Sequence, residues 1–203
     1  VICFAAGNFN APIADMANPA GFAWLDAGNG IHRATVGPIL NGLAAHPDVV
    51  AVAASTSLNK HAAYSNWGPE IKICAPSNNF HPLLPGVFVP GRGIWTTDNE
   101  ALGLDFQPGS RYTGGFGGTS SATPLVAGVA ALVLSANPDL TAHEVRSILE
   151  NTADKITDSD LDIISNVNRG QYDSSGHCDW FGFGKVNAEA AVAEAQRRAA
   201  GQK

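Results

Sequence analysis

Residues 114–133 read GGFGGTSSATPLVAGVAALV, with four glycines and the hydroxyl residues Thr119, Ser120 and Ser121 directly ahead of a long apolar run. The run predicts a central, enclosed helix over residues 120–136, because nearly every side of that helix would be apolar. Ser and Thr commonly cap helices, so a capped helix start is the simplest interpretation. A hydroxyl there also lies where backbone N–H groups point outward and the helix dipole favours negative charge, a setting that suits a nucleophilic serine. The stretch by itself favours the cap and leaves the nucleophile open.

The composition is that of a chain that buries much of itself. Of its 203 residues, 45% are hydrophobic and 15% are charged, enough for one globular domain with a substantial core. The formal net charge is -6, and Lys and Arg form no run that could follow phosphates, so we expect no nucleic-acid partner. The apolar segment 125–134 is shorter than the roughly 18 residues that span a bilayer, so we expect no membrane partner.

Cysteine usage and the N-terminus add two expectations. Cys3, Cys74 and Cys178 are too few and too scattered for a disulfide framework or a zinc site. Buried thiols that pack as small hydrophobes are favoured over a bridge. The chain opens on VICFAAGN, inside a strand-like segment and without Met or a basic leader, which suggests the later part of a longer polypeptide.

Continuous apolar runs predict the sheet. Runs rich in β-branched residues cover 1–6, 49–54, 71–75 and 94–97. Because they are continuous rather than alternating, they favour a parallel sheet covered on both faces. The expected fold class is therefore α/β, a mostly parallel sheet with helices on both faces.

Turn and cap signals predict the connections and the later helices. Asn59 and Lys60 mark a turn, and a capping box at Thr141 and Glu144 starts a helix. Asn187 is a plausible cap for NAEAAVAEAQRRAA. Two long loops, 9–47 and 77–92, interrupt this pattern.

The segment GGTSSATPLVAGVAAL resembles the nucleophile motif of the subtilisin-like serine peptidases (subtilases), in which Gly-Thr-Ser is followed by small residues and Pro. Matching by position, the resemblance implies that Ser120 is the nucleophile. Ser121 stands where many members have Met and where the proprotein-convertase branch has a small residue. The resemblance is therefore somewhat closer to that branch.

VICFAAGN resembles the family strand that ends in Ala-Ala-Gly-Asn. The resemblance implies that Asn8 is the side-chain donor of the oxyanion hole. It also implies that Ala5, Ala6 and Gly7 form one wall of the pocket for the residue before the scissile bond. A primary amide suits this role because it donates a directional N–H without a charge. Taken alone, an Asn after a strand is more often a turn residue.

Further segments resemble the family in its order, from residue 1 to about 195, and only the loops 9–47 and 77–92 stay unmatched. These segments are HPDVVAVAAS, AAYSNWGPEIKICAPS, GRGIWTTD, NPDLTAHEVRSILENTA and WFGFGKVNAEAAV. The resemblance implies a subtilisin-like fold in which residues 1–203 are the C-terminal portion of the peptidase catalytic domain, with N-terminal strands and helices missing.

The triad is incomplete in this chain. Subtilases carry Asp, His and Ser in that order, and the Asp and His precede the strand on which this chain opens. His81 is the least implausible replacement for the base among six histidines that lack a following Gly-Thr, the others being His32, His46, His61, His143 and His177. We therefore expect a serine endopeptidase as the parent protein, acting through an acyl-enzyme, and an inactive fragment. The alternative is a non-catalytic binding or assembly module of the same fold, whereas the absence of Gly-x-Ser-x-Gly excludes an α/β-hydrolase esterase.

Partners follow from the same resemblance. It implies a peptide or protein substrate, a secreted or periplasmic location, and no cofactor in this chain, with calcium a candidate in the full-length parent. Some members hold a cation through carbonyls that would here belong to Ala44, His46 and Val49, but the preceding loop differs and no metal site is assigned. An exposed sheet edge at 1–6 could pair with the missing N-terminal part or with a second copy.

Overall fold

The computed structural model describes residues 1–26, 29–99 and 107–201, and a three-stranded parallel sheet lies at its centre. The strand order is β1-β6-β7, with β1 pairing from Ile2 opposite Val49 to Ala5 opposite Val52. Every residue of β6 is buried, as its continuous apolar run predicted. The strands are β1 (Ile2–Ala5), β6 (Val49–Ser55) and β7 (Ile71–Pro76).

Alternate residues of β6 face two different apolar clusters. Val50 and Val52 pack among residues of the helices, whereas Ala51 and Ala53 pack with Trp180 and other residues of irregular segments. Helices were expected on both faces. Among the described residues they cover one face, and coil centred on Trp180 and Phe181 covers the other.

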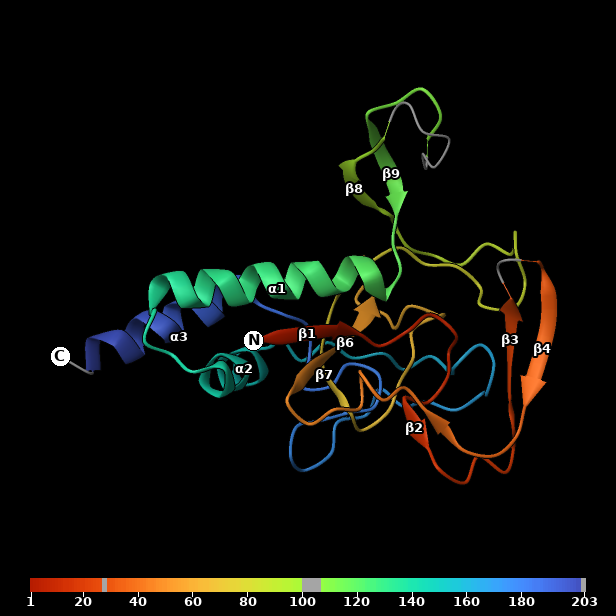
Figure 1. Cartoon of the computed structure of the whole chain (residues 1–203), viewed down its shortest axis with the longest axis horizontal. Helices are drawn as coiled ribbons and strands as arrows, with labels where there is room; N and C mark the ends of the chain where they lie inside the picture. Colours follow the sequence, from red (N-terminus) through yellow and green to blue (C-terminus); the bar gives the residue numbers. More distant parts are fainter. Residues whose placement is uncertain (27–28, 100–106, 202–203) are drawn as a thin grey trace.

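Three helices form the first layer. They are α1 (Thr119–Ala136), α2 (Ala142–Asn151) and α3 (Ala188–Gly201). Figure 1 shows α1 running along the sheet, with α2 and α3 near its C-terminal end. The capping box of α2 forms as predicted, because Thr141 Oγ1 accepts from Glu144 N and Glu144 Oε2 accepts from Thr141 N. The Asn187 cap also forms, with Oδ1 2.9 Å from Ala190 N.

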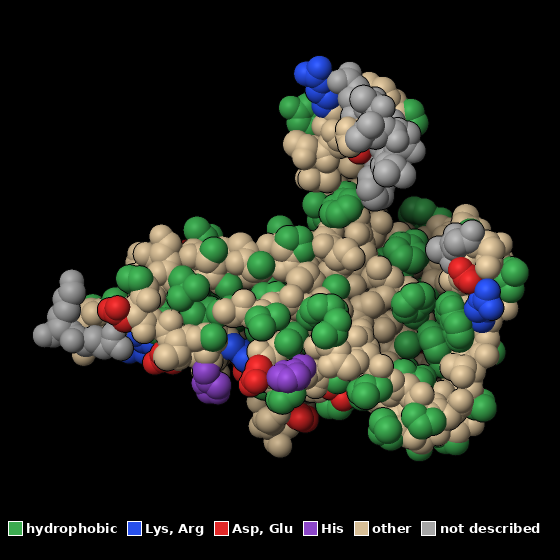
Figure 2. All heavy atoms as spheres, in the orientation of Figure 1, with side chains coloured by type: hydrophobic (Ala, Val, Ile, Leu, Met, Phe, Trp, Pro, Cys, Tyr) green, Lys and Arg blue, Asp and Glu red, His purple; other side chains and the backbone are tan. Residues whose placement is uncertain are grey.

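One side of α1 differs from the sequence-based expectation of an enclosed helix. Leu125 and Leu132 are exposed on the side away from the sheet, and Figure 2 shows hydrophobic side chains at the surface along this helix. The expectation that no segment is long enough to span a membrane was also wrong. α1 has 18 residues and, by length and composition alone, is long and apolar enough to cross one. Its other side packs on the sheet, as in a core helix.

The remaining strands form three antiparallel pairs outside the central sheet. They are β2 (Ala14–Asp15) with β5 (Ile39–Leu40), β3 (Phe22–Asp26) with β4 (Ile31–Thr35), and β8 (Ile94–Thr97) with β9 (Tyr112–Phe116). The first two pairs fill the predicted loop 9–47. β8 was expected in the parallel sheet, but it belongs to a hairpin that projects from the body in Figure 1 and leaves Trp95 76% exposed.

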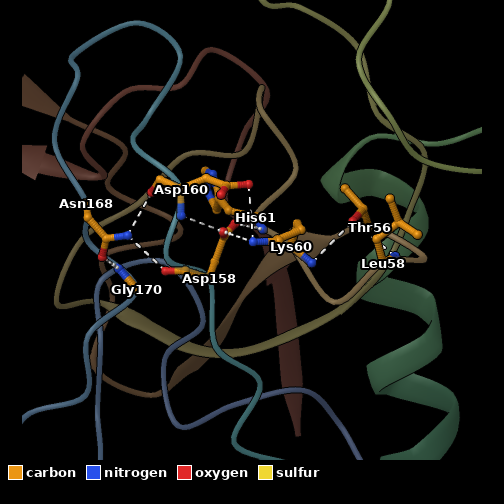
Figure 3. Close-up of polar contacts among 8 residues, drawn as sticks. All are labelled: Thr56, Leu58, Lys60, His61, Asp158, Asp160, Asn168 and Gly170. Carbon is orange, nitrogen blue, oxygen red and sulfur yellow. Dashed lines mark hydrogen bonds and ion pairs between the residues drawn. The ribbon is translucent and has the colours of Figure 1, made fainter.

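A polar cluster holds the coil that covers the second face (Figure 3). Asp158 accepts from Lys60 Nζ at 2.8 Å through Oδ1 and from the His61 backbone N–H at 2.9 Å through Oδ2. Asn168 Nδ2 donates to the backbone oxygens of Asp158 and Asp160. Asn59 has a positive φ of 59°, so the predicted turn beside this cluster is confirmed. The cluster joins the turn after β6 to a segment about 100 residues later.

All three cysteines carry free thiols. Cys74 and Cys178 are buried in the cluster that contains Trp180, as expected for thiols that pack as small hydrophobes. Burial raises the pKa of Cys74, which keeps it protonated and unreactive.

Candidate active site

The end of β1 meets the beginning of α1, and this junction brings the two predicted site segments together. Asn8 Oδ1 accepts from the Thr119 N–H at 2.8 Å and from Thr119 Oγ1 at 2.9 Å. The Gly7 N–H in turn donates to Thr119 Oγ1 at 3.1 Å. Residues more than a hundred positions apart are therefore tied by three hydrogen bonds, directly beside Ser120.

The three neighbouring hydroxyls have different surroundings. Thr119 is buried and bonded to the β1 segment, and Ser121 is buried with its Oγ 2.8 Å from Ser77 Oγ and 3.0 Å from the Gly118 carbonyl oxygen. Ser120 is exposed, and its Oγ forms no hydrogen bond with any residue that the structure describes. Of the three, Ser120 is the hydroxyl that a substrate could reach.

Two N–H donors remain available beside Ser120. The Asn8 side chain uses Oδ1 to hold Thr119, while its Nδ2 forms no hydrogen bond within the described ranges. The Ser120 backbone N–H lies in the first turn of α1, where no intrahelical acceptor exists. A developing negative charge would find both donors and the positive end of the helix dipole here.

Two glycines permit this close approach. Gly118 precedes α1 with φ 86° and ψ 166°, a conformation that is nearly restricted to glycine. A Cβ on Gly118 would lie 3.1 Å from Asn8 Nδ2. Gly7 has φ 109°, and a Cβ there would lie 2.6 Å from Asn66 Nδ2. Both positions bring backbone and amide together where a side chain would separate them.

Residues of the segment AAYSNWGPEIKICAPS support the turn before Ser120. Tyr64 is fully buried; its hydroxyl accepts from the Gly118 N–H at 3.1 Å and donates to Ser77 Oγ at 2.7 Å. Burial raises the pKa of Tyr64 to about 12, so the phenol keeps its proton. Asn78 Oδ1 also accepts from the Gly118 N–H, at 3.1 Å. The resemblance covers this segment, which ends at Ser77 and so excludes Asn78, but it assigned no site role to any of these side chains. Their concentration of hydroxyl and amide groups in an otherwise apolar region was the available signal.

The predicted substrate wall at Ala5, Ala6 and Gly7 exposes mainly backbone atoms. The Ala6 side chain is fully buried in the second apolar cluster, and its N–H donates to the Val52 carbonyl oxygen at 3.0 Å. Ala5 and Gly7 are partly exposed on either side of it. A substrate at this wall would therefore contact backbone and one small methyl group.

None of the six histidines hydrogen-bonds Ser120. His81 Nδ1 accepts from the N–H groups of Leu83 and Leu84, so the neutral ring carries its proton on Nε2, which makes that nitrogen a donor rather than a base. His61 is buried against Trp180, and burial lowers its pKa to about 4. His177 Nε2 lies 2.7 Å from the Ile71 carbonyl oxygen. The substitution of His81 for the family base therefore receives no support.

The segment before β6 and the first residue of that strand contain the residues of the cation site that the family resemblance suggested. The His46 carbonyl oxygen accepts from the Val49 N–H at 3.1 Å, and Ala44 is buried. Across residues 1–26, 29–99 and 107–201, no group of three or more His, Cys, Asp or Glu side chains converges as a metal site.

Comparisons with known proteins show the family of this chain. The family model described as "Subtilase family" matches residues 1–184. The chain is similar to the "Calcium-dependent protease" of Nostoc sp., with 39% identity over 154 residues, 75% of this chain and 22% of the relative. It is also similar to the "Extracellular protease" of Xanthomonas campestris pv. campestris, with 37% identity over 149 residues, 73% of this chain and 20% of the relative. The chain thus spans about a fifth of these relatives.

A solved structure supports the fold. The serine protease of Aeromonas sobria superposes with a TM-score of 0.64 and 21% identity, covering 95% of this chain and 36% of that one. The expected α/β class with a parallel, subtilisin-like sheet is confirmed.

Proposed function

Because the chain belongs to the subtilase family, we propose that residues 1–203 form the C-terminal portion of its catalytic domain and that the full-length protein is a serine endopeptidase. One observation carries the proposal. Ser120 is the exposed, unbonded hydroxyl at the start of α1, and the Asn8 amide is held beside it by Thr119.

The proposed chemistry is acyl transfer. Ser120 Oγ attacks the carbonyl carbon of the scissile peptide bond, and an acyl-enzyme forms as the amine leaves. The Asn8 Nδ2–H and the Ser120 backbone N–H hold the oxyanion, because both donors are free and both are uncharged. Water then releases the acyl group from Ser120 and restores the hydroxyl.

A base is needed to remove the Ser120 proton, and we propose that it lies outside this chain. The family resemblance assigns that role to a histidine oriented by an aspartate, both upstream of residue 1. In subtilisin itself, loss of the histidine alone lowers turnover by roughly a millionfold. We therefore propose that residues 1–203 alone hydrolyse peptides negligibly.

The test is made on the full-length protein, with Ser120→Ala beside Ser135→Ala. The control makes the same change at an exposed position on the same helix. We expect Ser120→Ala to lower kcat by roughly a millionfold and Ser135→Ala to leave kcat and KM unchanged. A fully active Ser120→Ala protein contradicts the proposal.

The alternative is a non-catalytic binding or assembly module. It is disfavoured because a module without activity needs neither an exposed Ser120 nor an unbonded Asn8 amide beside it. The residues upstream of Val1 decide between the two: a strand carrying Asp and a helix with His-Gly-Thr support the peptidase, and their absence supports the module.

We also propose a substrate class, a location, a family branch and a metal for the full-length protein. The substrate would be a peptide or protein, and a secreted or periplasmic location agrees with the name of the Xanthomonas relative. Closeness to the proprotein-convertase branch rests on Ser121 alone. Calcium, named for the Nostoc relative, is proposed for the full-length protein with no ligands assigned in this chain, and chelation should then lower the melting temperature of the full-length protein.

The open side of α1 and the edge of β1 are proposed to meet the rest of the catalytic domain. β1 has a single neighbour, β6, among the described strands. Val1 and Ile2 at this edge and Leu132 on α1 are exposed apolar residues. An upstream segment expressed in trans should bind this chain, whereas a stable dimer of the chain alone would point to self-association.

A further inference from the structure

A pocket of about 460 Å³ lies next to Asn8. Its walls come from Phe9 in the segment after β1, from Leu25 on β3 and from residues 80–82 and 84–87. The segments after Asn8 belong to the two loops that the family resemblance leaves unmatched. Figure 1 shows the second loop, in yellow-green, between the N-terminal end of α1 and the β3–β4 hairpin.

Most of the residues that line this pocket are apolar. Phe9, Phe80, Leu84 and Val87 keep between 39% and 51% of their surface exposed around it. Figure 2 shows hydrophobic side chains gathered between the base of the β8–β9 hairpin and the β3–β4 hairpin. Of the residues that the structure describes, no Asp, Glu, Lys or Arg lines the pocket, and the titratable side chain among them, His81, has its Nδ1 occupied by backbone N–H groups. Among the described residues, a charged group placed here would lose water without gaining an oppositely charged partner.

The pocket is connected to the turn that precedes Ser120. The Phe80 ring stacks on Tyr64 with centroids 4.1 Å apart and an interplanar angle of 13°. The Tyr64 hydroxyl accepts from the Gly118 N–H, and Asn8 itself lines the pocket. The same ring therefore supports the pocket wall and the backbone that positions Ser120.

We propose that this pocket binds one large, uncharged apolar side chain, aliphatic or aromatic, of the peptide substrate. The family resemblance gives the residue before the scissile bond the wall at Ala5, Ala6 and Gly7, which do not line this pocket, so we assign the pocket to another residue of the substrate. Burying such a side chain would also cover the exposed apolar atoms of Phe9, Phe80 and Leu84. The inference rests on the proposed peptidase function and adds a substrate class to it.

The test measures kcat/KM of the full-length protein on quenched fluorescent peptides in which one position at a time is Phe, Leu, Lys or Asp. At one position other than that before the scissile bond, we expect Phe and Leu to exceed Lys and Asp by roughly tenfold to a hundredfold. Leu84→Asp, a change at a 51% exposed side chain, should transfer the preference at that position to Lys. Leu58→Asp, at a 59% exposed leucine away from this pocket, should leave the preference unchanged.

A binding measurement separates this inference from the proposed chemistry. In Ser120→Ala full-length protein, calorimetry should give tighter binding for the Leu peptide than for its Asp counterpart, and Leu84→Asp should abolish the difference. If that difference is found but Ser120→Ala still cleaves peptides, the pocket binds an apolar side chain as proposed and Ser120 is not the nucleophile. If peptides are cleaved through Ser120 with no apolar preference, or Leu84→Asp changes nothing, the pocket inference is wrong.

Discussion

Asn8 uses the two ends of its amide for two tasks. Oδ1 accepts both the N–H and the hydroxyl of Thr119, while Nδ2 is unbonded among the described residues. Few side chains can accept at one end and donate at the other without carrying a charge. An aspartate would keep the first task and lose the second, which allows the two to be tested separately.

We expect Asn8→Asp in the full-length protein to lower kcat by roughly a hundredfold to a thousandfold, the usual cost of losing one oxyanion donor. The melting temperature should change little, because the acceptor for Thr119 is retained. Steady-state kinetics and thermal unfolding of the same preparation measure both. An unchanged kcat would remove Asn8 from the oxyanion hole.

At this scale the motifs predicted Ser120 and Asn8 as candidate site residues, but they gave no sign that Thr119 links the two segments. That link needs the end of β1 and the start of α1 in contact, 112 residues apart. The sequence did not predict a site role for Tyr64 for the same reason, because that role depends on a hydrogen bond from Gly118 that no local pattern encodes.

At the scale of elements, the start of α1 depends on backbone geometry rather than on a side-chain cap. No side chain caps this helix at Gly118, whose N–H instead meets Tyr64 and Asn78. The simplest interpretation of the sequence, that one of the three hydroxyls caps the helix, was therefore wrong. Thr119 bonds across to β1, Ser121 bonds to Ser77, and Ser120 is left exposed.

We expect Gly118→Ala to lower the free energy of unfolding by roughly 1–3 kcal/mol, because φ 86° with ψ 166° is strained for any residue with a Cβ. Gly128→Ala is the matched control, since that glycine lies inside α1 with no atom within 4 Å of an added Cβ. The control should instead gain up to about 1 kcal/mol from helix propensity. Urea unfolding of both variants gives the two values, and equal effects would contradict the strain.

Local patterns predicted β1, β6, β7 and the three helices, because each of these elements has its apolar run or its capping residues within one short stretch of sequence. They also predicted the strand β8 but placed it in the wrong sheet, since Ile94–Thr97 has the same β-branched composition in a buried parallel sheet and in an exposed hairpin. Its partner β9 and the short strands within 9–47 depend on pairing between distant segments.

At the scale of the whole molecule, coil rather than helix closes the second face of the sheet. His61 stacks on Trp180 with centroids 4.7 Å apart, and Asp158 holds the His61 backbone N–H. Burial lowers the pKa of the His61 side chain from 6.5 to about 4. The covering coil therefore packs around an uncharged imidazole.

We expect this imidazole to make the fold sensitive to acid. The unfolded chain binds a proton at His61 below about pH 6.5, whereas the folded chain resists until about pH 4. Stability is therefore full above pH 6.5 and declines by about 3 kcal/mol as the pH falls to 4. Urea unfolding at pH 7, 5.5 and 4 should give a shallower pH dependence for His61→Phe than for the natural chain. Equal slopes in the two proteins would show that the histidine does not titrate in this way.

The proposal that Ser120 is the nucleophile is tested most directly by a fluorophosphonate, which reacts with an activated serine. The full-length protein is labelled, digested and analysed by mass spectrometry. We predict one adduct, on Ser120, with loss of peptidase activity in proportion to labelling and no adduct in Ser120→Ala. An adduct on another residue that abolishes activity, or a fully labelled Ser120 in a protein that still cleaves peptides, would contradict the account.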